Sequence, residues 1–139
     1  MEITANAVQT IGANQNVIFT ETPVEGSCSI LHREGSGLTT LRGMTNQCRA
    51  RFRAFFSGNV ALPTGATVAP IQLAIAVNGE PVAATTMIYT PAAVEEYGNV
   101  ASAVYLDVCS GCCITVSVKN TTDAAIEIQN ANLIVERVA

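Results

Sequence analysis

Charged residues are scarce in this chain. Lys, Arg, Asp and Glu make up 13% of its 139 residues, whereas soluble domains carry about 25%. Since charge helps to keep an exposed surface soluble, this shortage indicates that part of the surface is covered in an oligomer or a larger assembly. The length predicts a single domain that can bury a core without disulfide or metal staples.

Basic residues are particularly few. Seven Lys and Arg against eleven Asp and Glu give a net charge of −4, which argues against a nucleic-acid partner bound through its phosphates. The start, MEITANAVQT, has an acid where a signal peptide has basic residues, and no apolar run follows, so we expect an intracellular product. The longest weakly polar stretch, residues 58–77, is interrupted by Pro63, Gly65 and Pro70, which argues against a membrane span.

Catalytic combinations of residues are missing as well. His32, the one histidine, shares strand parity with Cys28, but four residues of extended chain separate the two by about 13 Å, too far for a nucleophile pair. Glu95 and Glu96 are sequence neighbours and cannot face each other across a substrate as glycosidase carboxylates do. We therefore expect no enzymatic activity and no catalytic residue.

Helical stripes are absent, and runs rich in Val, Ile, Thr and Phe recur between Gly, Asn and Pro. This pattern predicts an all-β sandwich or barrel. The clearest strand, residues 71–77, is followed by Asn78-Gly79, the favoured type I′ hairpin turn. It places four apolar side chains on one face: Ile71, Leu73, Ile75 and Val77. Further strands are expected at 27–32, 38–41, 48–56, 81–89, 99–108, 112–118 and 125–138, and this total of about eight to ten strands is typical of a jelly roll.

The last expected strand has a defect in its alternation. Ile126 and Ile128 share one parity, whereas Leu133 and Val135 share the other. A β-bulge near Asn130 would restore a single apolar face.

The first sixteen residues, rich in Asn and Gln, are expected to form a mobile N-terminal arm ahead of a jelly-roll domain at residues 17–139. Such an arm would order on contact with a partner. Its candidate anchoring residues are Met1, Glu2, Ile3, Val8 and Ile11.

Three of the five cysteines crowd into CSGCC, residues 109–113. With an odd number of cysteines and no export signal, we expect reduced thiols. Ser110-Gly111 would form a turn, Cys112 would enter the apolar strand face with Ile114, and Cys113 would take the opposite face. Because adjacent cysteines diverge and no second close pair exists, zinc is disfavoured, and a β-branched strand does not suit a redox Cys-x-x-Cys. We predict buried cysteines that act as small hydrophobes, with no metal and no cofactor.

In CRARFRAFF, Arg49, Arg51 and Arg53 alternate with apolar residues, so three guanidinium groups line one strand face. A solvated outer face is one interpretation. The alternative is that they bind carboxylates such as Glu95 and Glu96 on a neighbouring subunit, since Arg suits bidentate contacts at interfaces.

Four stretches carry a family resemblance: RARFRAFFSGNV, IQLAIAVNGEPV, YLDVCSGCCITVSVKNTT and ANLIVERVA. In this order they resemble the trimeric jelly rolls of the tumour-necrosis-factor and complement-head type, including bacterial versions on spore-surface collagen-like proteins. The resemblance covers the chain from about Ser27. It implies a homotrimer packed about a three-fold axis, and the candidate interface residues are Arg49, Arg51, Arg53 and Cys113.

The bacterial members carry a Gly-x-y stalk, and this chain has no such repeat. A short domain of this kind looks more like a phage virion component, made in the bacterial cytoplasm and displayed on the virion surface as a capsid decoration or head-fibre protein. Its partners would then be phage capsid or fibre proteins. The alternatives are a fibre-tip module that binds a host receptor or glycan, which the absence of Trp and the 5% aromatic content disfavour, and a spore or cell-surface domain.

Overall fold

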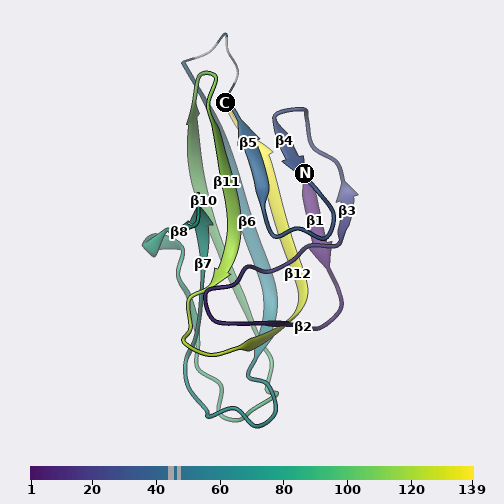
Figure 1. Cartoon of the computed structure of the whole chain (residues 1–139), viewed down its shortest axis with the longest axis vertical. Helices are drawn as coiled ribbons and strands as arrows, with labels where there is room; N and C mark the ends of the chain where they lie inside the picture. Colours follow the sequence, from purple (N-terminus) through teal and green to yellow (C-terminus); the bar gives the residue numbers. More distant parts are fainter. Residues whose placement is uncertain (44–45, 47) are drawn as a thin grey trace.

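The computed structural model describes residues 1–43, 46 and 48–139, which fold into two antiparallel β-sheets (Figure 1). Sheet A contains, in spatial order, β10 (Gly98–Cys109), β6 (Arg49–Ala61), β12 (Ile126–Arg137), β1 (Glu2–Ala5) and β3 (Glu21–Val24), and β2 (Gln9–Ile11) also pairs with β12. Sheet B contains β4 (Ile30–His32), β5 (Thr39–Arg42), β11 (Cys113–Asn120), β7 (Ile71–Val77) and β8 (Glu80–Pro81), and β9 (Met87–Tyr89) also pairs with β7. The predicted fold class, an all-β jelly-roll sandwich, is confirmed.

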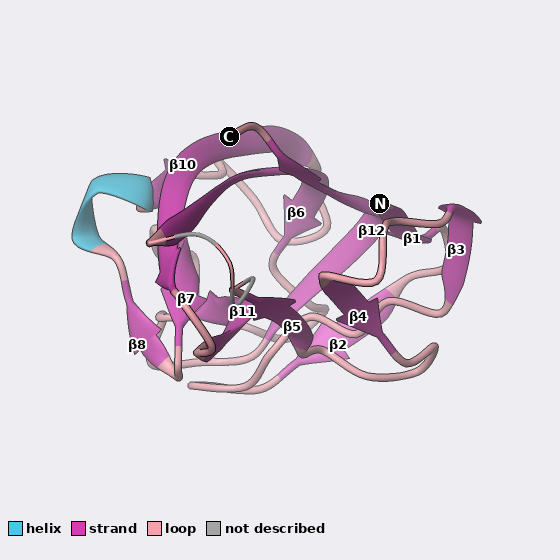
Figure 2. Ribbon diagram, turned by 90° about the horizontal axis from the view of Figure 1, so that it is seen from above, coloured by secondary structure: helices cyan, strands magenta, loops and turns pink. Residues whose placement is uncertain are grey.

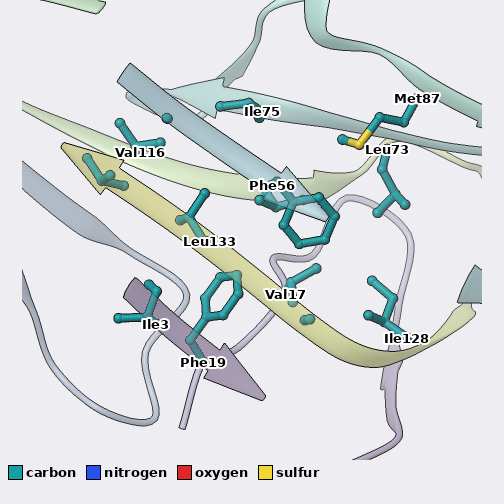
Figure 3. Close-up of a cluster of buried hydrophobic side chains, with 14 of the residues drawn as sticks. Ile3, Val17, Phe19, Phe56, Leu73, Ile75, Met87, Val116, Ile128 and Leu133 are labelled. Atoms are coloured by element: carbon teal, nitrogen blue, oxygen red, sulfur yellow. The ribbon is translucent and has the colours of Figure 1, made fainter. Parts of the chain in front are cut away.

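The inner faces of the two sheets meet in one apolar core. Figure 2 shows the two layers from above, and Figure 3 shows core side chains that converge from both sheets. Phe56 of β6 contacts Phe19 edge to face, with ring centroids 6.4 Å apart. Both rings are fully buried, so the aromatic residues bury large areas although the chain contains few of them.

Strand β6 alternates as its sequence predicts. Phe52 and Phe56 point into the core with no exposed surface, whereas Arg51 and Arg53 lie on the outer, half-buried face. On β7 the predicted apolar face is also confirmed, because Ile71, Leu73 and Ile75 are fully buried. Both central residues of the following turn have positive φ, 51° at Asn78 and 84° at Gly79, as a type I′ turn requires.

The return from this turn differs from the continuous strand expected at residues 81–89. Strand β8 ends at Pro81, and a 3₁₀ turn, η1 (Ala83–Thr85), precedes β9. Proline lacks the N–H that a ladder needs. The buried hydroxyl of Thr85 donates to the carbonyl of Val82 at 2.7 Å and accepts the N–H of Ile75 at 2.9 Å. The side chain thus replaces part of the missing ladder.

The predicted bulge in β12 is confirmed. The register between β12 and β6 shifts between Gln129 and Asn132, and Asn130 has a φ of 55°. As a result, Ile128 before the shift and Leu133 after it are both fully buried on the core side.

The expected mobile arm is contradicted by the structure. Strand β1 pairs with β12 and with β3, and β2 pairs with β12. Ile3 is fully buried and Ile11 is 3% exposed, so both belong to the core. Burial of these apolar side chains in the sandwich is more favourable in free energy than the conformational freedom of a mobile segment. Residues 1–16 are therefore part of the sandwich, and Val8 is the exposed residue among the apolar anchoring candidates.

Candidate functional site

The outer face of sheet A carries exposed apolar side chains. On the edge strand β10, the Tyr105 side chain is 65% exposed, and Ala101 and Ala103 are exposed beside it. The register places Ala103 opposite Phe55 of β6, and Phe55 opposite Ile134 of β12, which is 36% exposed. We call these five residues the sheet A face. They form a row across three strands that is more apolar than a solvated surface needs to be.

Strand β10 adds a free edge to this face. It is twelve residues long, is the outermost strand of sheet A, and contains Asp107 as its one charged residue. Long edge strands normally carry Lys, Pro or a bulge that prevents pairing with another chain. Strand β10 has none of these, so it is suited to contact with another protein surface.

The three predicted arginines lie on the same outer face of β6 as Phe55, as their spacing indicates. Each of them has a carboxylate partner within the chain. Arg51 binds Asp107 through two hydrogen bonds, of 2.8 Å from Nε and 3.2 Å from Nη2. Arg49 lies 3.6 Å from Asp107, and Arg53 lies 3.4 Å from Glu136. These exposed pairs add little stability, but they neutralise most of the positive charge on the face.

Asp107 and Arg51 shift each other's pKa. The hydrogen bond from Arg51 lowers the pKa of Asp107 below its ordinary value of 3.8, and the same contact raises the pKa of Arg51. A folded-state pKa below the unfolded value means that this contact stabilises the fold above pH 4 or so, and that its contribution is lost as the pH falls through the folded-state pKa.

A carboxylate titration followed by NMR tests this pairing. We expect Asp107 to titrate below its ordinary value in the wild type and close to it in Arg51→Gln, because that variant removes the bidentate donor. Arg42→Gln, in sheet B, serves as the matched control and should leave Asp107 unchanged. An unshifted Asp107 in the wild type would contradict the pairing.

The predicted partners Glu95 and Glu96 lie at the other end of strand β10. They precede its first residue, Gly98, whereas Arg53 pairs with Tyr105, seven residues further along, or about 23 Å at the usual strand rise. A contact between these acids and the arginines of a neighbouring subunit stays a prediction. Within its own chain, Glu95 accepts a hydrogen bond from the Thr64 hydroxyl at 2.6 Å.

The cysteines correct the sequence analysis. Cys109 and Cys112 form a disulfide with their Cα atoms 5.3 Å apart, so the expectation of reduced thiols is wrong for this pair. Cys28, Cys48 and Cys113 are free and exposed, so the expectation of buried cysteines is wrong as well. The predicted turn is present, with a φ of 73° at Gly111. Because Cys112 lies in this turn and not in β11, strand parity does not govern its direction.

Loss of this disulfide should have a moderate effect on stability. The loop it closes spans four residues, so the chain-entropy model predicts that Cys109→Ser/Cys112→Ser lowers the free energy of unfolding by about 2 kcal/mol. Urea unfolding at a fixed protein concentration measures the change, with Cys28→Ser as the control. Equal losses in the two variants would contradict a specific role of the disulfide.

A hollow between β3 and β4 is lined by residues that include Glu25, Cys28, His32 and Glu34. His32 bonds the carbonyl of Ser36 through Nε2 at 2.9 Å and packs its ring against Phe19. Within the described residues, no group of three or more His, Cys, Asp or Glu side chains is placed to hold a metal ion. In the same part of the chain, no helix is long and apolar enough to cross a membrane.

Comparison with known proteins bears on the fold. No family model and no curated protein matches the chain. Among solved structures, the globular domain of zebrafish complement 1qA protein matches with a TM-score of 0.59 at 12% identity, over 96% of this chain and 93% of that one. The chain has a jelly-roll fold that is similar to that of this complement domain. A carbohydrate-binding module, the CBM35 of Cellvibrio japonicus Abf62, matches with a TM-score of 0.42 at 12% identity, over 100% of this chain and 98% of that one.

The family resemblance seen in the sequence is therefore confirmed at the level of the fold. At 12% identity the complement head shows a shared architecture and not a shared activity. Because one fold supports many functions, the function depends on particular surfaces, which here are the sheet A face, edge strand β10 and the turn that carries the disulfide.

Proposed function

We propose that this chain is a non-catalytic structural module that assembles as a homotrimer through the sheet A face and edge strand β10. The observation that carries this proposal is the position of Tyr105. Its ring is 65% exposed on an edge strand with a single charged residue. A large exposed aromatic side chain beside paired arginines and carboxylates is the type of residue that dominates interface energies.

Two features support a partner that is a second copy of the chain. An edge and a face of the same sheet are different surfaces, so their contact between copies is heterologous, and such contacts form a ring when the rotation between copies closes. The neighbouring arginines already have carboxylate partners, so burial of the face does not isolate three positive charges. The three-fold order comes from the resemblance to trimeric jelly rolls.

Light scattering with two matched variants tests the assembly. We expect the wild type to have three times the subunit mass of 14.5 kDa, and Tyr105→Glu to be a folded monomer, because a buried unpaired carboxylate is costly. Ile88→Glu is the control, since Ile88 is 62% exposed on β9 of the opposite sheet.

A monomeric wild type, or equal dissociation of the Ile88→Glu variant, would refute the proposed interface. Circular dichroism of each variant separates dissociation from unfolding.

The finer part of the proposal is that the trimer decorates a phage capsid or caps a head fibre. It rests on the sequence resemblance. Val8 and Ile18, 49% and 43% exposed, line an apolar hollow with Ala5 and Ala7, which would suit contact with the particle. Because Ile3 belongs to the core, removal of the N-terminal segment cannot test this contact cleanly.

Val8→Glu is the sharper variant. We expect it to remain a trimer in solution and to lose binding to purified particles, whereas Ile88→Glu should retain both properties. Particle binding that survives in Val8→Glu would refute this anchoring surface. Neighbouring capsid and tail genes would support the virion role, and neighbouring sporulation genes would overturn it.

A second candidate, glycan binding, is favoured by one observation. Arg51, Tyr105 and Asp107 line a shallow hollow, and an aromatic ring beside paired hydrogen-bonding groups suits a sugar. The same surface cannot serve a trimer interface and a glycan at once. A glycan array probed with the wild type and with Tyr105→Ala discriminates the two, because glycan binding predicts a signal that the variant loses.

A further inference from the structure

The turn between β10 and β11 carries a disulfide and is followed directly by a free thiol. It lies towards the upper end of the molecule in Figure 1, far from the middle of either sheet. It carries the Cys109–Cys112 disulfide and, immediately after it, the free thiol of Cys113. All three cysteines are exposed. A thiol is a nucleophile as its thiolate, and an exposed disulfide is its electrophile.

The chain itself does not bring these two groups together productively. Cys113 is the first residue of β11, opposite Arg42 of β5 in sheet B, whereas Cys109 is the last residue of β10, opposite Arg49 of β6 in sheet A. A disulfide between the adjacent Cys112 and Cys113 would also close an eight-membered ring through a peptide bond that prefers to be trans. The thiol of Cys113 is thus available to the disulfide of another molecule.

We propose that the β10–β11 turn is a thiol–disulfide exchange site that links two copies of this chain covalently. The Cys113 thiolate of one copy attacks the Cys109 sulfur of a second copy. A Cys113–Cys109 bond forms between the copies, the Cys109–Cys112 bond breaks, and the proton lost by Cys113 passes to the released Cys112. The two copies together hold two disulfides before the step and two after it, so no oxidant is needed.

A second copy fits this site because the same turn supplies both reactants. Two turns that meet around a two-fold axis offer each other one thiol and one disulfide, which is the self-complementarity of an isologous contact. Positive charge does not prevent the approach on the β10 side, since Arg49, the register partner of Cys109, lies 3.6 Å from Asp107. Cys109 is the last residue of β10, four positions beyond Tyr105. The turn therefore lies at one end of the proposed trimer interface, and a link through it would join one trimer to another end to end.

In the released copy, the Cys112 thiol keeps a local partner. In the disulfide form its sulfur lies 3.7 Å from the carbonyl oxygen of Ser110, so a released thiol at this position would donate a weak S–H hydrogen bond to that carbonyl. The leaving group is therefore held in the turn, where it can attack the new bond and reverse the exchange.

A mixing experiment tests the exchange. Cys113→Ser keeps the disulfide without its nucleophile, and Cys109→Ser/Cys112→Ser keeps the Cys113 thiol without the electrophile. The two proteins, one bearing a mass tag, are mixed without oxygen and with a metal chelator, alkylated, and separated on non-reducing gels. We expect a covalent heterodimer in the mixture, with at least tenfold less cross-linked product in either protein alone.

The wild type supplies the quantitative check. Exchange leaves an average of three free thiols per chain, the number in the structure, because one copy loses the Cys113 thiol and the other gains the Cys112 thiol. Oxidation of thiols would lower this average. Cys28→Ser should cross-link as the wild type does. The proposal is overturned by a mixture that stays monomeric on the gel, by cross-linking of Cys113→Ser alone at the wild-type level, or by a falling thiol count. Light scattering of Cys113→Ser reports on the trimer independently.

Discussion

Replacement of Asn120 with alanine is expected to lower the free energy of unfolding by about 3 kcal/mol, because it leaves one buried and three partly buried backbone groups without this partner. The Asn120 side chain is fully buried. Its amide nitrogen donates to the carbonyls of Ile11, Gly12 and Ala124, at 3.1, 3.2 and 2.9 Å, and its oxygen accepts the N–H of Thr122 at 2.9 Å. One side chain thus ties the N-terminal segment to the β11–β12 turn.

Urea unfolding at one protein concentration measures this loss, since assembly would make stability concentration-dependent. Asn120→Asp keeps the size and the acceptor but removes the donors, so it should be at least as destabilising as Asn120→Ala. Asn99→Ala is the matched control, because Asn99 is exposed and bonds Asn59 at the surface; we expect a change within about 0.5 kcal/mol. A similar loss in both alanine variants would contradict the bridging role of Asn120.

The second large effect is expected at Phe56. Its ring is fully buried against Phe19, and Phe56→Ala should lower the free energy of unfolding by about 4 kcal/mol through lost burial and the cavity that remains. The neighbouring Phe55 is half-buried on the outer face, where the guanidinium of Arg53 lies 5.9 Å from its ring centroid.

Phe55→Ala is therefore the matched control for Phe56→Ala. We expect it to cost about 1 kcal/mol or less in a monomeric Tyr105→Glu background, and to weaken self-association in the otherwise unchanged protein. The two substitutions differ by one position along β6, so comparable losses of stability would refute the strand parity on which the sheet A face depends.

Local patterns were enough to predict much of this fold. The alternation in RARFRAFF fixes which side of β6 is buried, because side chains on a strand have a period of two. The Asn78-Gly79 turn and the bulge near Asn130 follow in the same way from backbone conformations that few residues adopt. Each of these features is determined within about ten residues of sequence.

Other features depend on contacts between distant residues and could not be predicted from local pattern. Asp107 and Glu136 pair with the arginines because of the register among β10, β6 and β12, which the sequence does not reveal. The Cys109–Cys112 bond depends on a turn that brings the two Cα atoms to 5.3 Å. A signal for β1 was present, since Ile3 and Ala5 alternate with polar neighbours in EITA, but the Asn and Gln content suggested an arm instead.

The place of β12 in sheet A has a consequence for synthesis on the ribosome. This strand lies between β6 and β1, although it is formed by residues 126–137. Until those residues emerge, β6 lacks one of its two neighbours, and β1 cannot be joined to the β6–β10 pair. The nascent chain therefore holds an incomplete sandwich with exposed apolar edges until residues 126–137 are made, which favours slow folding.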